Sequence, residues 1–109
     1  MYRLMYMSTA APEMTDESVD ILVDRARKKN DALNITGVIG FNGLNFAQIL
    51  EGQKENILSL MNEIRSDNRH SGIIVTGERE VSKRAYPDFG MRRVHGLDFA
   101  AEWSKMQSD

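Results

Sequence analysis

The chain has 109 residues, which is enough for one domain with a single core and too few for two independent ones. Hydrophobic residues make up 41% and charged residues 28%, which excludes a disordered or fibrous chain. The 14 basic and 16 acidic residues are mixed along the sequence with a net charge of -2, so no nucleic-acid partner is expected. The absence of cysteine excludes disulfides, thiolate catalysis and cysteine-bound metals.

Nothing in the sequence indicates export or membrane insertion. The N-terminus, MYRLMYMS, lacks the long apolar core and cleavage site of a secretory signal. No apolar run approaches the length of a membrane span. We therefore expect a cytoplasmic protein with no membrane contact.

The first predicted element is a strand over residues 2–8. Its alternation places Leu4 and Tyr6 on one face and Arg3, Met5 and Met7 on the other. The sequence Ala-Ala-Pro at positions 10–12 then ends the strand.

A helix follows, with Thr15 as its N-cap and Asp16 and Glu17 as negative charges in the first turn. Asn30 lies about one turn beyond Ala26, so it should point inward from the last turn, unlike Lys28. The apolar face is formed by Val19, Leu22, Val23 and Ala26.

Residues 35–41 and 44–50 predict two strands joined at Asn42-Gly43, a strong hairpin signal. Phe46, Gln48 and Leu50 share one face of the second strand, which places a glutamine among apolar neighbours. A buried amide without partners costs roughly 1–3 kcal/mol, so a bound polar ligand is one natural partner and the backbone is another.

A second helix should end near Ser66, because Ile57, Leu60, Met61 and Ile64 recur at helical spacing. A strand over residues 73–76 follows. Pro87 interrupts regular pairing before a last strand over residues 89–94, in which Phe89, Met91 and Arg93 share a face.

The predicted order, βαββαββ, is that of a ferredoxin-like α+β sandwich. We assign residues 1–94 to this domain and residues 95–109 to a short C-terminal helical extension. In that extension, residues 97–106 place Phe99, Ala100, Trp103 and Met106 at helical spacings.

Known catalytic patterns are absent from the sequence. His70 and His95 lack the additional ligands of a metal site, so no metal is expected. Ser8 and Ser71 form no recognisable nucleophile–base arrangement, and there is no glycine-rich phosphate loop. An acylphosphatase-like hydrolase shares the strand and helix order, but its glycine-rich loop with an arginine is missing.

Five segments follow one another along the chain: residues 3–8 (RLMYMS), Asn30 followed by residues 35–37 (ITG), residues 46–52 (FAQILEG), residues 67–70 (DNRH) and residues 84–91. In their order and spacing these segments resemble the motifs of the BLUF family of flavin-binding light sensors. The resemblance covers nearly the whole domain. The sequence departs from the family at Phe89, where many members have a tryptophan, and Trp103 lies outside the motif.

The resemblance implies a noncovalent flavin between the two helices, usually FAD, with FMN possible. Asn30 would bind the pyrimidine edge of the ring, and Gln48 would lie between Tyr6 and flavin N5/O4. Lys29 would flank the ring or phosphate, although an ordinary surface role for Lys29 and Arg69 is equally open. The other matched positions are the apolar residues Leu22, Ile35, Phe46 and Leu50 along the ring, and Asp67, Arg69 and His70 towards the ribityl-phosphate side.

The chemistry implied is photosensing by a protein that is not an enzyme. Tyr6 would give an electron and a proton to the excited flavin, and Gln48 would rotate or tautomerise, since its amide both donates and accepts. Met91 would pass the change to the last strand, with a homo-oligomer and a downstream protein as partners. Phe89 cannot supply an indole N–H, and we assign Trp103 to packing of the terminal helix. The alternative is a flavin-binding or protein-interaction module without photochemistry.

Overall fold

A computed structural model describes residues 1–87 and 90–95. Its elements are β1 (Tyr2–Ala10), α1 (Asp16–Ala32), β2 (Thr36–Phe41), β3 (Asn45–Gly52), α2 (Lys54–Ser66), β4 (His70–Glu80) and β5 (Arg92–His95). The predicted order βαββαββ is confirmed.

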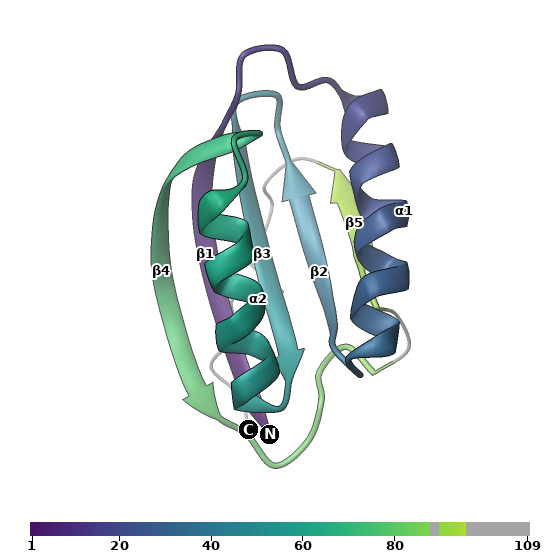
Figure 1. The fold of residues 1–109 in the computed structure, drawn as a ribbon, viewed down its shortest axis with the longest axis vertical. Coiled ribbons are helices and arrows are strands. Elements are labelled where there is room, and N and C mark those ends of the chain that lie inside the picture. Colours follow the sequence, from purple (N-terminus) through teal and green to yellow (C-terminus); the bar gives the residue numbers. More distant parts are fainter. Residues whose placement is uncertain (88–89, 96–109) are drawn as a thin grey trace.

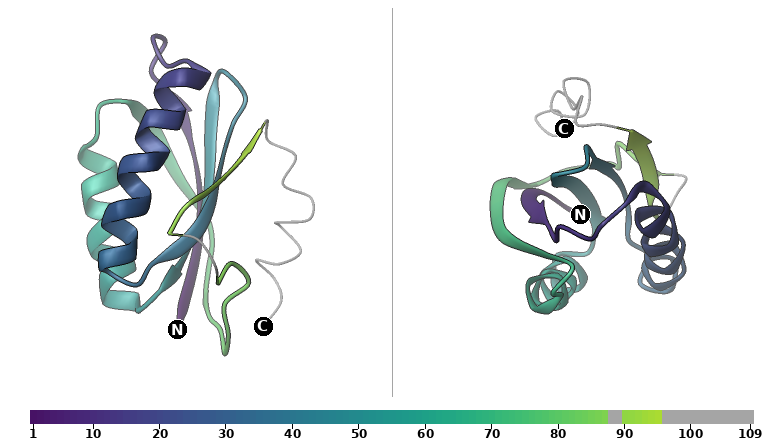
Figure 2. Two further views of the ribbon diagram at one scale, coloured as in Figure 1. Left: turned by 90° about the vertical axis from the view of Figure 1, so that its right-hand side faces the viewer. Right: turned by 90° about the horizontal axis from the view of Figure 1, so that it is seen from above.

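The strands form one mixed sheet in the order β4-β1-β3-β2-β5. The pairs β1–β3, β1–β4 and β2–β3 are antiparallel, while β5 lies parallel to β2 at the edge. Both helices cover the same face of the sheet (Figures 1 and 2). The first four strands have the ferredoxin-like arrangement, so the predicted fold class is confirmed.

The last two strands differ in length from the prediction. The predicted strand over residues 73–76 is the apolar middle of β4, which runs over eleven residues because its backbone pairs with β1 along its length. The predicted strand over residues 89–94 was placed too early, because β5 begins at Arg92 and Met91 precedes it. Phe89 and the predicted helix over residues 97–106 lie outside the described residues.

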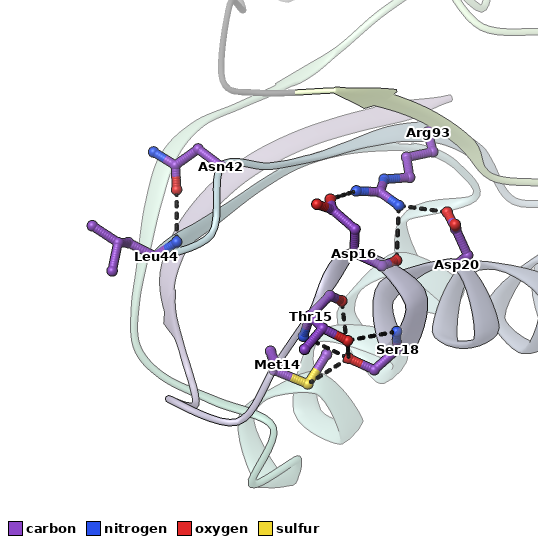
Figure 3. Close-up of polar contacts among 8 residues, drawn as sticks. All are labelled: Met14, Thr15, Asp16, Ser18, Asp20, Asn42, Leu44 and Arg93. Carbon is purple, nitrogen blue, oxygen red and sulfur yellow. Dashed lines mark hydrogen bonds and ion pairs between the residues drawn. The ribbon is translucent and has the colours of Figure 1, made fainter.

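Local side-chain hydrogen bonds fix the start of α1 and the β2–β3 turn (Figure 3). The Thr15 backbone N–H donates to Ser18 Oγ at 2.7 Å, and Ser18 N–H donates to Thr15 Oγ1 at 3.2 Å. This capping box confirms the predicted N-cap. In the turn, Asn42 Oδ1 accepts from the Leu44 N–H at 2.9 Å, while Gly43 supplies a φ of 96°.

The two faces of the sheet carry separate cores. Residues including Leu4, Val23 and Met61 pack between the sheet and the helices. The opposite core consists of Met5, Val38, Ala47, Ile49 and Tyr86, the last coming from the segment after β4. No helix within residues 1–87 and 90–95 is long and apolar enough to cross a membrane.

Candidate functional site

A cavity of about 240 Å³ lies between the two helices and the sheet. This volume is close to the lower end of the range of roughly 300–1,000 Å³ typical of small-molecule pockets. It is lined by Tyr6, Leu22, Arg25, Ala26, Lys29, Asn30, Ile39, Phe46, Gln48, Leu60, Glu63, Ile64, Asp67, Arg69 and His70.

Tyr6 and Gln48 form a hydrogen-bonded pair in the wall of this cavity. They are direct cross-strand partners on β1 and β3, and both are buried. The Tyr6 hydroxyl donates to Gln48 Oε1, and Gln48 Nε2 donates to Met91 Sδ at 3.4 Å. Gln48 therefore connects the tyrosine to the segment that leads into β5.

The ionisation of Tyr6 decides which way this hydrogen bond runs. Burial raises the pKa of the Tyr6 phenol, and the negative charge of Asp67 raises it further. The Asp67 carboxylate is itself stabilised by Arg69, whose guanidinium hydrogen bonds lower the pKa of Asp67. Tyr6 is therefore a neutral donor at physiological pH, and this favours the Gln48 orientation with its carbonyl oxygen towards the phenol.

Asn30 is the second buried amide at the cavity, 2% exposed in the last turn of α1. Its Nδ2 donates to the Gly90 carbonyl at 2.9 Å. Its backbone carbonyl accepts from the Leu33 and Ile35 N–H groups, which end the helix and start the path into β2. The inward direction predicted for Asn30 is thus what the structure has.

His70 is held at the wall by both ring nitrogens. Its Nε2 lies 2.8 Å from the Ile64 carbonyl, which can only accept, so Nε2 carries a proton. Its Nδ1 lies 2.7 Å from Ser8 Oγ. The ring meets Phe46 edge-on at 6.0 Å between centroids. Both ring nitrogens of His70 are therefore engaged by the protein, although the residue lines the cavity.

Charged side chains surround the mouth of the cavity. Lys29 of α1 pairs with Glu63 of α2, and both side chains are about half exposed. Arg69 Nε donates to Asp67 Oδ1 at 2.9 Å just beyond α2. Together with Arg25, these groups give the entrance both signs of charge, whereas the interior has apolar walls and two amides.

Most of the residues predicted for the site come together. Tyr6, Leu22, Lys29, Asn30, Phe46, Gln48, Asp67, Arg69 and His70 all line the cavity. Ile35 and Leu50 instead pack fully buried in the adjoining core, and Met91 lies behind Gln48.

The sequence reasoning missed six lining residues. Ala26, Leu60 and Ile64 were already on the predicted inward faces of the helices, and Ile39 alternates with Phe41 on β2, so periodicity carried a usable signal for these four. Arg25 and Glu63 gave no such signal, because charged residues on a helix surface are the norm.

The chemistry of the cavity fits a flavin. A flat tricyclic ring with one polar edge needs apolar walls and a few groups that both donate and accept, and Asn30 and Gln48 supply those groups. In the part of the chain that the structure describes, the partner of Gln48 Nε2 is a thioether, a weak acceptor that a carbonyl oxygen would outcompete.

The fold and cavity define a small α+β ligand-binding domain with a tyrosine–glutamine pair in the cavity wall. Residues 1–92 match the sequence profile of the BLUF family, described as "Sensors of blue-light using FAD". The chain therefore belongs to the BLUF family.

Relatives and solved structures agree with this placement. The chain is 35% identical over 85 residues to the photoactivated adenylate cyclase subunit beta of Euglena longa, covering 77% of this chain but 10% of that protein. The structure of Klebsiella pneumoniae BlrP1 with FMN and cyclic diGMP gives a TM-score of 0.80 at 39% identity, covering 86% of this chain and 25% of that one. The dark-state structure of BlrB, a BLUF protein, gives 0.80 at 28% identity, covering 97% and 83%.

Proposed function

We propose that the chain is a blue-light photoreceptor that binds a flavin noncovalently between α1 and α2. The observation that carries this proposal is the buried hydrogen bond from the Tyr6 hydroxyl to Gln48 Oε1 in the cavity wall. We propose FAD as the flavin, with FMN as the alternative. Analysis of the flavin released from the purified protein distinguishes the two.

The described residues divide into three groups for holding such a ligand. Asn30 and Gln48 would bind the polar edge of the ring, and Arg25, Lys29 and Arg69 are the cations available to a phosphate. The ring would pack against Leu22, Ile39, Phe46, Leu60 and Ile64. A bound flavin absorbs blue light and, once excited, accepts an electron.

Tyr6 is the electron donor in this proposal. It would supply one electron to a bound, excited flavin, and its phenolic proton would pass along the hydrogen bond to Gln48 Oε1 and on to the same flavin. Both return to Tyr6, so no net chemistry remains. Burial favours this coupling, since a raised phenol pKa keeps the proton on Tyr6 until the electron leaves.

Gln48 converts the transient loss of a proton into an altered set of hydrogen bonds. Without its proton, the Tyr6 oxygen can only accept, so it favours the N–H end of the amide. We favour rotation over tautomerisation because the amide's other contact, Met91 Sδ at 3.4 Å, is a weak acceptor that resists rotation little. The altered contact at Met91 would then reach β5 and a protein partner, a second copy or another domain.

The test is the absorption spectrum of the flavin-loaded protein before and after blue illumination. We expect a reversible red shift in the wild type and, in Tyr6→Phe, bound flavin with no lasting shift. Tyr2→Phe is the matched control, because Tyr2 is a buried tyrosine on the same face of β1 that bonds Glu78 instead. It should keep the shift.

Three results would contradict the proposal in different ways. A normal red shift in Tyr6→Phe would remove Tyr6 from the photochemistry. Bound flavin without a shift in the wild type would leave a flavin-binding module without photochemistry. A protein that stays colourless after flavin is added would leave protein interaction as its function.

A further inference from the structure

The segment from Gly90 to Arg93 is attached to α1 by side chains as well as to the sheet by backbone. The strand β5 has four residues and, among residues 1–87 and 90–95, pairs with β2 alone at the edge of the sheet. Arg27 Nε donates to the Met91 carbonyl at 3.1 Å, and Asn30 Nδ2 donates to the Gly90 carbonyl at 2.9 Å. Both tethers start from the C-terminal half of α1.

A third tether lies at the other end of the helix (Figure 3). Arg93 Nη1 donates to the Asp16 carbonyl at 3.0 Å, and the guanidinium also pairs with the carboxylates of Asp16 and Asp20. Only 7% of the Arg93 side chain is exposed, whereas the two aspartates are largely exposed.

The tethering residues form one stripe along α1. Positions 16, 20, 27 and 30 fall on the same side of an α-helix, and they meet residues 93, 91 and 90 in reverse order. The segment therefore runs antiparallel along the helix. A Cβ on Gly90 would come within 2.7 Å of the Arg27 carbonyl oxygen, so this close approach requires glycine.

The Arg93 contact depends strongly on the two aspartates. The N-terminus of a helix carries partial positive charge, so a cation there is disfavoured. Asp16 and Asp20 reverse this local field and bind the guanidinium from two sides. Both carboxylates are exposed and stay in water when the contact opens, so opening requires the Arg93 guanidinium to move from its buried position into solvent.

We propose that Arg93, Asp16 and Asp20 form a latch that holds β5 against α1 in the dark and opens when Gln48 changes its hydrogen bonds. The path is continuous: Gln48 Nε2 contacts Met91 Sδ, and Met91 lies two residues before Arg93. Light would then expose the Arg93 guanidinium and the first turn of α1 together as output surface. This inference rests on the proposed photochemistry, and its experiment separates the two.

The experiment measures amide hydrogen exchange at residues 92–95 in the dark and under blue light, alongside the flavin absorption spectrum. The latch variant is Asp16→Asn with Asp20→Asn. Glu17→Gln is the matched control, because Glu17 is an exposed first-turn carboxylate of the same helix and its removal weakens the helix dipole interaction alone.

In the wild type, light should raise exchange at these amides by about fivefold, the order expected for losing an ion-pair network whose carboxylates are exposed to solvent. The latch variant should exchange about fivefold faster already in the dark, with or without flavin, and light should add nothing although the red shift persists. Glu17→Gln should behave as the wild type.

Unchanged dark exchange in the latch variant would overturn the proposal, as would a light response equal to that of the wild type. A wild-type red shift without faster exchange at residues 92–95 would also overturn it, leaving the photoreceptor function intact. Absence of the red shift itself would refute the photoreceptor function, while the dark comparison would still decide whether the latch holds β5.

Discussion

The strands β1 and β3 carry two buried polar pairs, one on each face of the sheet, and the pairs differ in how tightly they are fixed. Tyr6–Gln48 faces the helices and the cavity, and Arg3–Glu51 faces the opposite side. Both are direct cross-strand partners. The same two strands thus hold a neutral pair and a charged pair only three residues apart.

The charged pair is surrounded by hydrogen bonds. Arg3 Nε donates to Glu51 Oε2 at 2.8 Å, and both side chains are almost fully buried. Glu51 also accepts from the backbone N–H groups of Ala85, at 2.9 Å, and Tyr86, at 2.7 Å. Moving either charge would separate two opposite charges that are buried together, which is costly, so this face fixes the segment after β4 in place.

The neutral pair can rearrange at much lower cost. Gln48 is bonded to a phenol on one side and a thioether on the other, and the cavity lies beside it. Rotating a neutral amide exchanges one hydrogen bond for another, each worth about 0.5–1.5 kcal/mol. The comparison teaches that a rearrangement of the charged pair would cost far more free energy than a rearrangement of the neutral pair.

The largest expected effect comes from breaking the charged pair. Glu51→Gln removes the charge with little change in shape and takes the compensating carboxylate away from the buried Arg3 guanidinium, so the free energy of unfolding should fall by about 3–5 kcal/mol in urea titrations. Glu80→Gln is the control, because Glu80 is largely exposed and its pair with the N-terminus should be worth at most ~1 kcal/mol. Similar losses in the two variants would contradict the rigid role of Arg3–Glu51.

A smaller loss of unfolding free energy is expected at alkaline pH, from Tyr6 in the neutral pair. Burial raises the pKa of Tyr6 in the folded state, so its contribution to stability is fully present below the unfolded value of about 10 and is lost as pH rises above it. Above pH ~10 the free energy of unfolding of the wild type should therefore fall more steeply with pH than that of Tyr6→Phe. The difference between the two slopes should correspond to about one proton bound in the folded state.

Tyr2 provides a comparison for the pH effect. Burial and the hydrogen bond to Glu78 raise its pKa to about 12. In Tyr2→Phe the free energy of unfolding should therefore also fall less steeply above pH ~10 than in the wild type. Urea unfolding across this range measures both slopes. Parallel profiles for the wild type and Tyr6→Phe would mean that the Tyr6 phenol ionises as easily in the folded state as in the unfolded one.

The sequence predicted the neutral pair, Tyr6–Gln48, better than the charged pair, Arg3–Glu51. Alternation places Tyr6 and Gln48 among apolar neighbours, and helical spacing turns Asn30 inward, so an unusual polar residue on an apolar face marks each position. Their direct pairing could not be predicted, because alternation fixes the face of each strand but not the register between them.

The missed features depend on distant partners. Charged residues such as Arg3 and Glu51 predict exposure unless a partner is known, and the two are 48 residues apart. The Arg93 contacts to Asp16 and Asp20 join positions more than 70 residues apart. The length of β4 was missed for a similar reason, since backbone pairing with β1 continues past its apolar middle to Glu80.

The smallest expected effect on stability is at Met91. Met91→Leu keeps nearly the same volume in a fully buried site, so the unfolding free energy should change by less than about 1.5 kcal/mol. Leucine cannot accept the Gln48 Nε2 hydrogen bond, so the red shift should persist while the light-driven change in exchange at residues 92–95 weakens.

Met5→Leu is the matched control for the opposite face, because Met5 is also buried but packs with Tyr86 in the core away from the helices. It should leave both the red shift and the exchange response unchanged. Equal loss of the exchange response in the two variants would mean that signalling responds to core packing in general. A loss confined to Met91→Leu would instead assign signal transfer to the neutral face and to the sulfur atom that contacts Gln48, since the volume change is the same in both.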